Sequence, residues 1–266
     1  MPLTLDVELA FARDLAVTAG DILTRHFGTG FDVQMKGWAD PVTVADRESE
    51  ALIRSAIQRR FPDDGLDGEE EGRRTGTSGR TWLIDPLDGT ADFAAGLPIF
   101  AVVLTLLDVS DPNRALLNVT YDPIRRELFH AVHGQGAWMN GQRIHARRAS
   151  DLAGALVHLH FSNKRAVWEA SMELARRVTA VAPHARNLGS TALAQAYVAS
   201  GRLDAHVKVQ SGDWDVVGGS LLIEEAEGIV TDLAGAPWRI GGSLLAAGPA
   251  LHPLLLDLTR DLPVPS

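Results

Sequence analysis

The stretch that most constrains the fold is residues 82–90, which read WLIDPLDGT. Its first three residues are bulky and apolar, which is typical of a buried strand. Such a strand would deliver Asp85 at its carboxyl end. Pro86 has no N–H group and cannot continue the hydrogen-bond ladder, so we expect the strand to stop at this residue.

The turn after this strand carries two carboxylates and a Gly-Thr step. Asp85 and Asp88 are three residues apart and can share hard cations. Gly89 lets the backbone come close to a ligand, and Thr90 can cap a following helix. Because free N–H groups at the start of a helix favour an anion, a phosphate could bridge the cations and the helix end. We therefore place the chemistry of the protein at this turn.

Composition limits the class of protein. A chain of 266 residues with 45% apolar residues can build a large core, as one domain or as two halves around a shared sheet. The formal net charge of -9 makes nucleic acid an unlikely partner and favours small ligands. The absence of cysteine excludes disulfides, thiolate zinc sites and cysteine nucleophiles. Charged residues interrupt the N-terminal segment and no long apolar run occurs, so we expect a cytoplasmic protein that does not bind membranes.

The first part of the chain reads as helices. Apolar residues recur at helical spacing over residues 5–27 and again from Val44. Thr43 and Asp46 match the spacing of a capping box, which explains Asp46 without any catalytic role. Residues 63–71 form an acidic loop just before the turn. A carboxylate of this loop could supply a third metal ligand.

Apolar runs after the turn predict an antiparallel or mixed sheet, with strands at 100–107, 116–121 and 127–133. A change of composition near Ser150 suggests a boundary between two halves, residues 1–150 and 151–266. The second half alternates, with strands at 155–160 and 203–209 and helices at 166–179, 190–200 and after Asp215.

Three features of the second half stand out. In the strand at 203–209, His206 and Lys208 point to the same side of the sheet. Asp215 can cap the helix that follows it, and this role is compatible with metal binding. Gly218 and Gly219 would weaken that helix, so we expect a reason for them such as a close approach of the backbone.

The donor set indicates the metal. Hard oxygen donors without nearby cysteine or paired histidine point to Mg²⁺, which prefers a few carboxylates, water and substrate phosphate. No Walker A loop occurs, so hydrolysis of nucleoside triphosphates has no support. Residues 88–90 resemble part of the motif of aspartyl-phosphate phosphatases of the haloacid dehalogenase class, but Pro86 stands where their nucleophilic aspartate would be. We therefore expect attack by a metal-activated water.

A family resemblance follows from four motifs in order. These are residues 40–46 (DPVTVAD), 68–70 (GEE), 82–90 (WLIDPLDGT), and 214–215 (WD) with 225–226 (EA). Residues 134–141 (GQGAWMNG) are similar to a hairpin of the same family. Over nearly its full length the chain resembles the inositol monophosphatase family of Mg²⁺-dependent, lithium-sensitive phosphatases.

The resemblance implies a layered αβαβα sandwich of the α+β or α/β class, usually a homodimer, with metal ions between the halves. Most metal ligands would come from residues 1–150, while residues 151–266 would contribute Asp215 and the substrate pocket. The implied metal ligands are Glu69, Asp85, the Leu87 carbonyl, Asp88 and Asp215. Thr90, Asp46 and Glu69 would orient and deprotonate the attacking water. The implied substrate contacts are Lys36, Gly89, Thr90, Gly189, Ser190 and Thr191.

Two positions depart from the family pattern. Asp92 stands where the family commonly has Asn. Lys208 stands where animal members have a Glu that accepts hydrogen bonds from inositol hydroxyls, and an ammonium group cannot accept them. Lys208 therefore either faces solvent or contacts a second acidic group of the substrate.

These features predict a Mg²⁺-dependent phosphomonoesterase that hydrolyses a small phosphorylated metabolite, with inositol 1-phosphate or a related sugar phosphate as the first expectation. A substrate contact of Lys208 would favour fructose 1,6-bisphosphate or an adenosine bisphosphate, and would disfavour the cationic histidinol phosphate. The alternatives within the family are thus fructose-1,6-bisphosphatase, 3'(2'),5'-bisphosphate nucleotidase and histidinol-phosphatase. An alternative of another class is a transcription antitermination factor that binds RNA polymerase.

Overall fold

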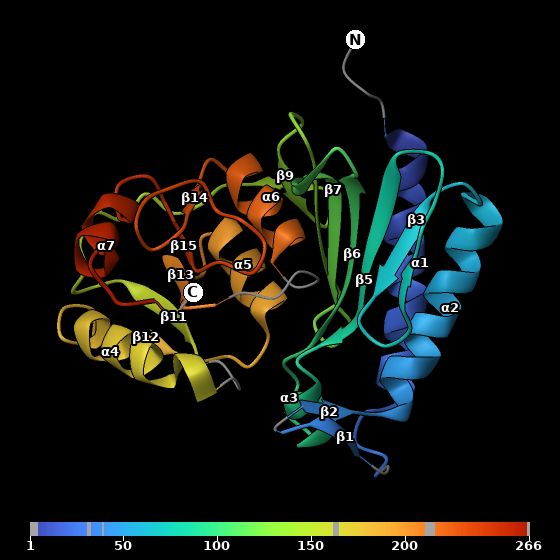
Figure 1. Cartoon of the computed structure of the whole chain (residues 1–266), viewed down its shortest axis with the longest axis horizontal. Coiled ribbons are helices and arrows are strands. Elements are labelled where there is room, and N and C mark those ends of the chain that lie inside the picture. The colour runs from blue at the N-terminus through green and yellow to red at the C-terminus, as the bar shows by residue number, and fades with distance from the viewer. Residues whose placement is uncertain (1–4, 31–32, 39, 162–164, 211–215, 265–266) are drawn as a thin grey trace.

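The computed structural model describes residues 5–30, 33–38, 40–161, 165–210 and 216–264. Figure 1 shows five layers. From one side to the other they are a helix pair, a large sheet, a central helix pair, a smaller sheet and an outer helix pair. The layered αβαβα sandwich expected from the sequence is confirmed.

The larger sheet has eight strands. In spatial order they are β10 (Gln142–Ile144), β9 (Ala137–Met139), β8 (Glu127–Val132), β7 (Asp111–Asp122), β6 (Ala101–Asp108), β5 (Arg80–Asp88), β3 (Gly65–Gly68) and β4 (Gly72–Arg74). Only β3 and β5 pair in parallel. A separate hairpin joins β1 (Gln34–Gly37) to β2 (Asp40–Val42).

The smaller sheet has five strands. In spatial order they are β12 (His184–Arg186), β11 (Leu156–His160), β13 (Ala205–Lys208), β15 (Leu244–Ala247) and β14 (Ile229–Thr231). The strands of the larger sheet thus end at Ile144 and those of the smaller sheet begin at Leu156. The functional division into residues 1–150 and 151–266 stays a prediction.

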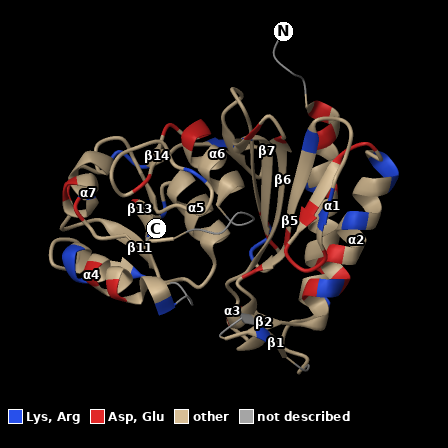
Figure 2. Ribbon diagram, viewed as in Figure 1, with Lys and Arg blue, Asp and Glu red and all other residues tan. Residues whose placement is uncertain are grey.

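The helices fill the other three layers. The first pair is α1 (Asp6–His26) and α2 (Val44–Arg60), the central pair is α5 (Thr191–Ala199) and α6 (Val217–Glu225), and the outer pair is α4 (Trp168–Thr179) and α7 (His252–Thr259). A short helix, α3 (Thr90–Ala94), follows β5, and the 3₁₀ helix η1 (Arg165–Val167) precedes α4. Figure 2 shows mixed charges on the outer faces of α2 and α4, whereas α5 carries none. No helix within the described ranges is long and apolar enough to cross a membrane.

The predicted capping box of α2 is confirmed. The Thr43 hydroxyl accepts a hydrogen bond from the Ala45 N–H, and the Thr43 N–H donates to the Asp46 carboxylate at 2.8 Å. The box fixes the start of α2 and therefore the position of Asp46.

The strand β5 does not stop at Pro86, so that prediction was wrong. It continues to Asp88, and its register against β6 shifts between Asp85 and Asp88. A bulge of this kind accommodates a proline because one residue of the bulged strand leaves the ladder. Trp82 and Ile84 lie in the core under α1 and α2, whereas Leu83 packs in the core of α5 and α6. Because side chains alternate along a strand, Asp85 faces the second half.

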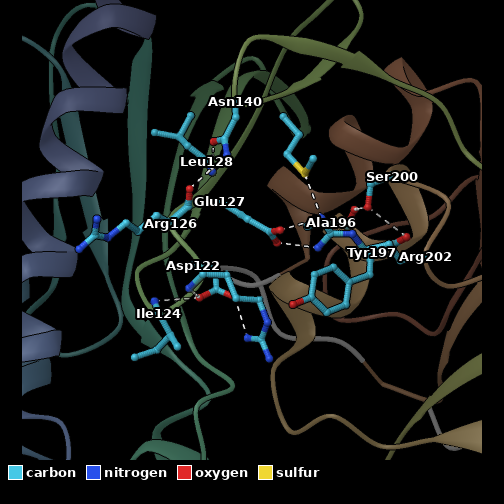
Figure 3. A network of polar contacts seen from close by, with 12 residues as sticks. Asp122, Ile124, Arg126, Glu127, Leu128, Asn140, Ala196, Tyr197, Ser200 and Arg202 are labelled. Carbon is cyan, nitrogen blue, oxygen red and sulfur yellow. Dashed lines mark hydrogen bonds and ion pairs between the residues drawn. The ribbon is translucent and has the colours of Figure 1, made fainter.

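A polar network joins the larger sheet to the end of α5 (Figure 3). Arg202 donates two hydrogen bonds to the Glu127 carboxylate, at 2.5 and 2.7 Å. The Arg202 guanidinium also lies 5.2 Å from the centre of the Tyr197 ring on α5. Paired, planar contacts of this kind fix orientation as well as distance.

The expected close approach to Gly218 and Gly219 is confirmed. A Cβ atom at Gly218 would lie 2.1 Å from Oδ1 of Asn118 and 2.2 Å from Oγ1 of Thr105 on the larger sheet. A Cβ atom at Gly219 would lie 2.1 Å from Oε1 of Gln195 on α5. These glycines therefore let α6 pack directly on both of its neighbours.

We expect Gly218→Ala to destabilise the protein by about 1 to 3 kcal/mol, because the added methyl group overpacks a buried contact. Urea denaturation followed by circular dichroism measures the change. The matched control is Gly154→Ala, where a Cβ atom would meet only the Asp151 carboxylate at an ordinary 3.4 Å. Equal stability of the Gly218 variant and the wild type would contradict the packing described for α6.

Candidate active site

The turn after β5 is held by short local contacts. The Asp85 carboxylate accepts a hydrogen bond from the Leu87 N–H at 3.0 Å. Gly89 has a left-handed backbone (φ 97°), and a Cβ atom there would lie 2.7 Å from the carbonyl oxygen of Ile99. Glycine is therefore required at this position on two grounds, conformation and space.

Thr90 does not cap α3, contrary to the prediction. The helix starts at Thr90, and Gly89 is its N-cap residue, without a side-chain cap. The Thr90 hydroxyl instead lies 3.1 Å from Oδ1 of Asp46 and 2.9 Å from the Leu87 carbonyl oxygen. Asp46 thus belongs to the capping box of α2 and is also a hydrogen-bond partner of Thr90. Two predicted catalytic residues are therefore in direct contact.

Glu69 follows β3 and lies beside the turn. Because β3 runs parallel to β5 with Gly68 opposite Ile84, residue 69 comes next to residue 85. The Glu69 N–H donates to the Ile84 carbonyl at 3.2 Å. The backbone therefore brings Glu69 to the same edge of the sheet as Asp85.

Glu50 supports this loop, and the sequence reasoning missed it. Its fully buried carboxylate accepts hydrogen bonds from the Glu70 N–H at 2.8 Å and the Glu71 N–H at 3.0 Å. A Cβ atom at Gly68 would lie 2.0 Å from Oε1 of Glu50, so the glycine makes room for the contact. The available signal was a Glu among the inward positions of an amphipathic helix, four residues before Arg54.

Lys36 reaches the site from the hairpin β1–β2. Its ammonium group lies 2.9 Å from Oε1 of Glu69 and 2.7 Å from Oε1 of Glu70. Burial alone would lower the pKa of Lys36, but the attraction of Glu69 and the hydrogen bonds to both carboxylates outweigh it and raise the pKa. Lys36 therefore stays charged.

Burial makes negative charge costly at this site. It raises the pKa of Glu69 to about 7, against the lowering effect of Lys36. Burial also raises the pKa of Asp46, against the hydrogen bonds from Thr43 that lower it. Carboxylates whose charge is poorly compensated gain from an added cation.

Asp88 joins the turn to the second half. Its carboxylate accepts hydrogen bonds from the N–H groups of Thr191 at 3.2 Å and Ala192 at 2.8 Å, and from the Ser190 hydroxyl. These donors form the N-terminus of α5. The predicted substrate-pocket residues Ser190 and Thr191 are thus in direct contact with a predicted metal ligand.

The structure places Gly189 beside Asp92, the first departure from the family pattern. Gly189 has a left-handed backbone (φ 77°), and a Cβ atom there would lie 2.1 Å from Oδ2 of Asp92. Burial raises the pKa of Asp92. The Asp92 carboxylate therefore occupies the space that a side chain at residue 189 would need.

Lys208 does not face solvent, so that alternative is wrong. Its side chain is buried, and its ammonium group lies 3.3 Å from the Thr191 hydroxyl. His160, opposite Lys208 on the neighbouring parallel strand, has Nδ1 3.4 Å from the same hydroxyl. The sequence alone does not connect His160 with the site, because only the pairing of β11 with β13 brings His160 next to Lys208.

A buried histidine pair lies on the same face. His158 and His206 approach with Nδ1 atoms 2.7 Å apart and with stacked rings. Burial lowers the pKa of His158 to about 3 and lowers that of His206 well below its usual range. Both rings are therefore neutral and add no charge beside Lys208.

The oxygen donors at the turn are chemically suited to bind a hard divalent cation. The predicted ligands Glu69, Asp85, Asp88 and the Leu87 carbonyl all offer oxygen, and the two aspartates are buried. The fifth, Asp215, lies outside the described residues. Within the described ranges no three acidic or histidine side chains are grouped as a metal site. Metal binding therefore stays a proposal.

We expect Asp88→Asn to lower turnover by about 100-fold or more and to destabilise the protein by about 0.5 to 2 kcal/mol. The amide group would oppose one of the donors at the start of α5 and would carry no charge. Steady-state kinetics and urea denaturation measure the two effects. The matched control is Asp108→Asn, because Asp108 also accepts hydrogen bonds from a serine hydroxyl and an N–H group, but far from the turn. Near-native turnover of Asp88→Asn would contradict a role for its charge.

Comparison with known proteins agrees with this geometry. The sequence model of the inositol monophosphatase family matches residues 4–263. Nus factor SuhB of Escherichia coli strain K12 is 35% identical over 258 residues, which cover 95% of this chain and 96% of that protein.

Solved structures are similar over almost the whole chain. The extragenic suppressor protein SuhB of Bartonella henselae has a TM-score of 0.91 at 29% identity, covering 96% of this chain and 99% of that one. The IMPase of Thermotoga maritima has a TM-score of 0.87 at 30% identity, covering 96% and 97%.

Proposed function

The chain belongs to the inositol monophosphatase family, and we propose that it is a Mg²⁺-dependent phosphomonoesterase of small phosphorylated metabolites. The observation that carries the proposal is the 3.1 Å contact between the Thr90 hydroxyl and Asp46 on the turn that also bears Asp85 and Asp88. This contact brings together a hydroxyl and a buried carboxylate from segments 44 residues apart. Such a pair is suited to orienting a water molecule for attack on phosphorus.

The proposed metal ligands are Glu69, Asp85, the Leu87 carbonyl, Asp88 and Asp215. When bound there, Mg²⁺ supplies Lewis acidity that offsets charge on the phosphoryl oxygens and lowers the pKa of water. The orientation of the Asp88 carboxylate is held by three donors at the start of α5, the Ser190 hydroxyl and the N–H groups of Thr191 and Ala192.

Residues of the protein itself carry out the other parts of the proposed reaction. The Thr90 hydroxyl donates to Asp46, so its oxygen can accept a hydrogen bond from the attacking water. Glu69 takes one proton of that water as the water oxygen bonds to phosphorus. The bond from phosphorus to the ester oxygen breaks, and this oxygen takes up a proton from bulk water to leave as an alcohol. Gly89 and the N–H group of Thr90 contact the phosphate. Lys36 adds positive charge next to Glu69.

Lys208 supports the choice of substrate class. A buried ammonium group beside Thr191 favours a substrate with a second acidic group. We infer that a bisphosphate, such as fructose 1,6-bisphosphate or an adenosine bisphosphate, is preferred over inositol 1-phosphate. Gly189, Ser190 and Thr191 would line the pocket for the organic part of that substrate. The cytoplasmic location and the homodimer stay predictions.

We expect the protein to release phosphate from small phosphomonoesters with Mg²⁺, and to lose this activity with EDTA and in the presence of Li⁺. A panel of inositol 1-phosphate, fructose 1,6-bisphosphate, adenosine 3',5'-bisphosphate and histidinol phosphate is the test. Thr90→Val should lower the rate by about 100-fold, because it removes the hydroxyl that orients the water. Thr24→Val, which removes an exposed hydroxyl of α1, is the control. Metal-independent hydrolysis, or none on the panel, would rule the proposal out.

We expect Lys208→Met to lower the catalytic efficiency on bisphosphates about tenfold more than on inositol 1-phosphate. Methionine keeps most of the buried stem and removes the charge. The measurement is the ratio of kcat/KM values for the two substrate types, with Lys208→Arg as the variant that keeps the charge. An unchanged ratio removes Lys208 from substrate recognition.

A second candidate function rests on the names of relatives. Proteins 35% identical to this chain are called Nus factor SuhB. We infer that a role in transcription antitermination through binding RNA polymerase is the alternative, although the net charge of -9 does not favour contact with RNA. A binding assay with purified RNA polymerase, run beside the phosphate-release panel, separates the two functions.

A further inference from the structure

A cluster of aromatic and cationic side chains joins the hairpin β1–β2 to the second half of the protein. Trp38, in the hairpin turn, and Trp168, at the start of α4, have ring centres 5.3 Å apart. The Arg165 guanidinium lies 5.1 Å from the Trp38 ring centre and 5.8 Å from that of Trp168. We call these three residues the tryptophan clasp.

The clasp cannot be explained as part of a buried core. Trp38 is 55% exposed and Trp168 is 41% exposed. Every residue of β1 is exposed as well. Large exposed aromatic rings that nevertheless contact each other across two segments 130 positions apart point to a specific docking contact.

The clasp and the active site share the same hairpin. Lys36, two residues before Trp38, holds Glu69 and Glu70 through its ammonium group. Gln34, at the other end of β1, accepts a hydrogen bond from Arg47 of α2 at 2.7 Å. The hairpin is thus tied to the first half through Gln34 and Lys36, and to the second half through Trp38.

We propose that Trp38 is a positioning residue that acts through Lys36. Its contact with Trp168 and Arg165 docks the hairpin across the two halves and thereby holds the Lys36 ammonium group at Glu69. An aromatic pair together with an exposed cation–π contact shifts a docking equilibrium by about tenfold. Without the clasp, Lys36 would be held at the site for a smaller fraction of the time.

The consequence for catalysis rests on the proposed function and on the substrate contact that the family resemblance implies for Lys36. Loss of a contact made equally with substrate and transition state raises KM and leaves kcat nearly unchanged. Trp38→Ala should therefore raise KM about three- to tenfold, with kcat within about twofold of the wild type. Trp38→Phe keeps a ring for Trp168 and Arg165 and should restore most of the loss.

A double-mutant cycle shows whether Trp38 acts through Lys36. In a Lys36→Met background, the further effect of Trp38→Ala on KM should fall below about twofold, because the group that it positions is already gone. Additive effects of the two substitutions would overturn the positioning role. Trp138→Ala, which removes a partly buried indole from β9, is the control and should leave KM unchanged.

Hydrogen exchange tests the docking itself without any activity. Backbone amides of residues 34–37 should exchange faster in Trp38→Ala than in the wild type, and at the wild-type rate in Trp138→Ala. Unchanged exchange in Trp38→Ala would overturn the clasp while the proposed function stands. If the wild type hydrolyses no phosphomonoester, the proposed function fails, and the exchange rates still decide whether Trp38 docks the hairpin.

Discussion

The contact between the Asp88 carboxylate and the start of α5 holds the site together. Asp88 ends a strand of the larger sheet, while its hydrogen-bond donors begin a helix that packs under the smaller sheet. Free N–H groups at a helix start favour negative charge, so the contact stabilises the carboxylate and the helix together. Through Thr191 the same helix reaches His160 and Lys208. The Asp88 carboxylate therefore helps to place Thr191, His160 and Lys208 relative to the turn.

Electrostatics explain why the turn needs positive charge. Asp46 and Glu69 both have raised pKa values because they are buried. Lys36 compensates part of this charge from an exposed hairpin, whereas Arg54 belongs to the support around Glu50 rather than to the turn. A divalent cation would complete the compensation where the carboxylates gather.

Much of this arrangement could be predicted from the sequence, because local rules govern it. The capping box of α2, the apolar run of β5 and the close approach at Gly218 each follow from residue type and spacing. The continuation of β5 through Pro86 could not be predicted, because the bulge depends on pairing with β6. For the same reason the meeting of His160 with Lys208 was hidden, since it depends on which strands lie side by side.

The tight seating of α6 has a mechanical consequence. Since Gly218 and Gly219 leave no space between this helix and the larger sheet or α5, neither neighbour can slide past it without a clash. This packing then fixes the distances from α6 to the larger sheet and to α5. Larger movements are therefore expected at the periphery of the molecule, for example at the exposed hairpin β1–β2.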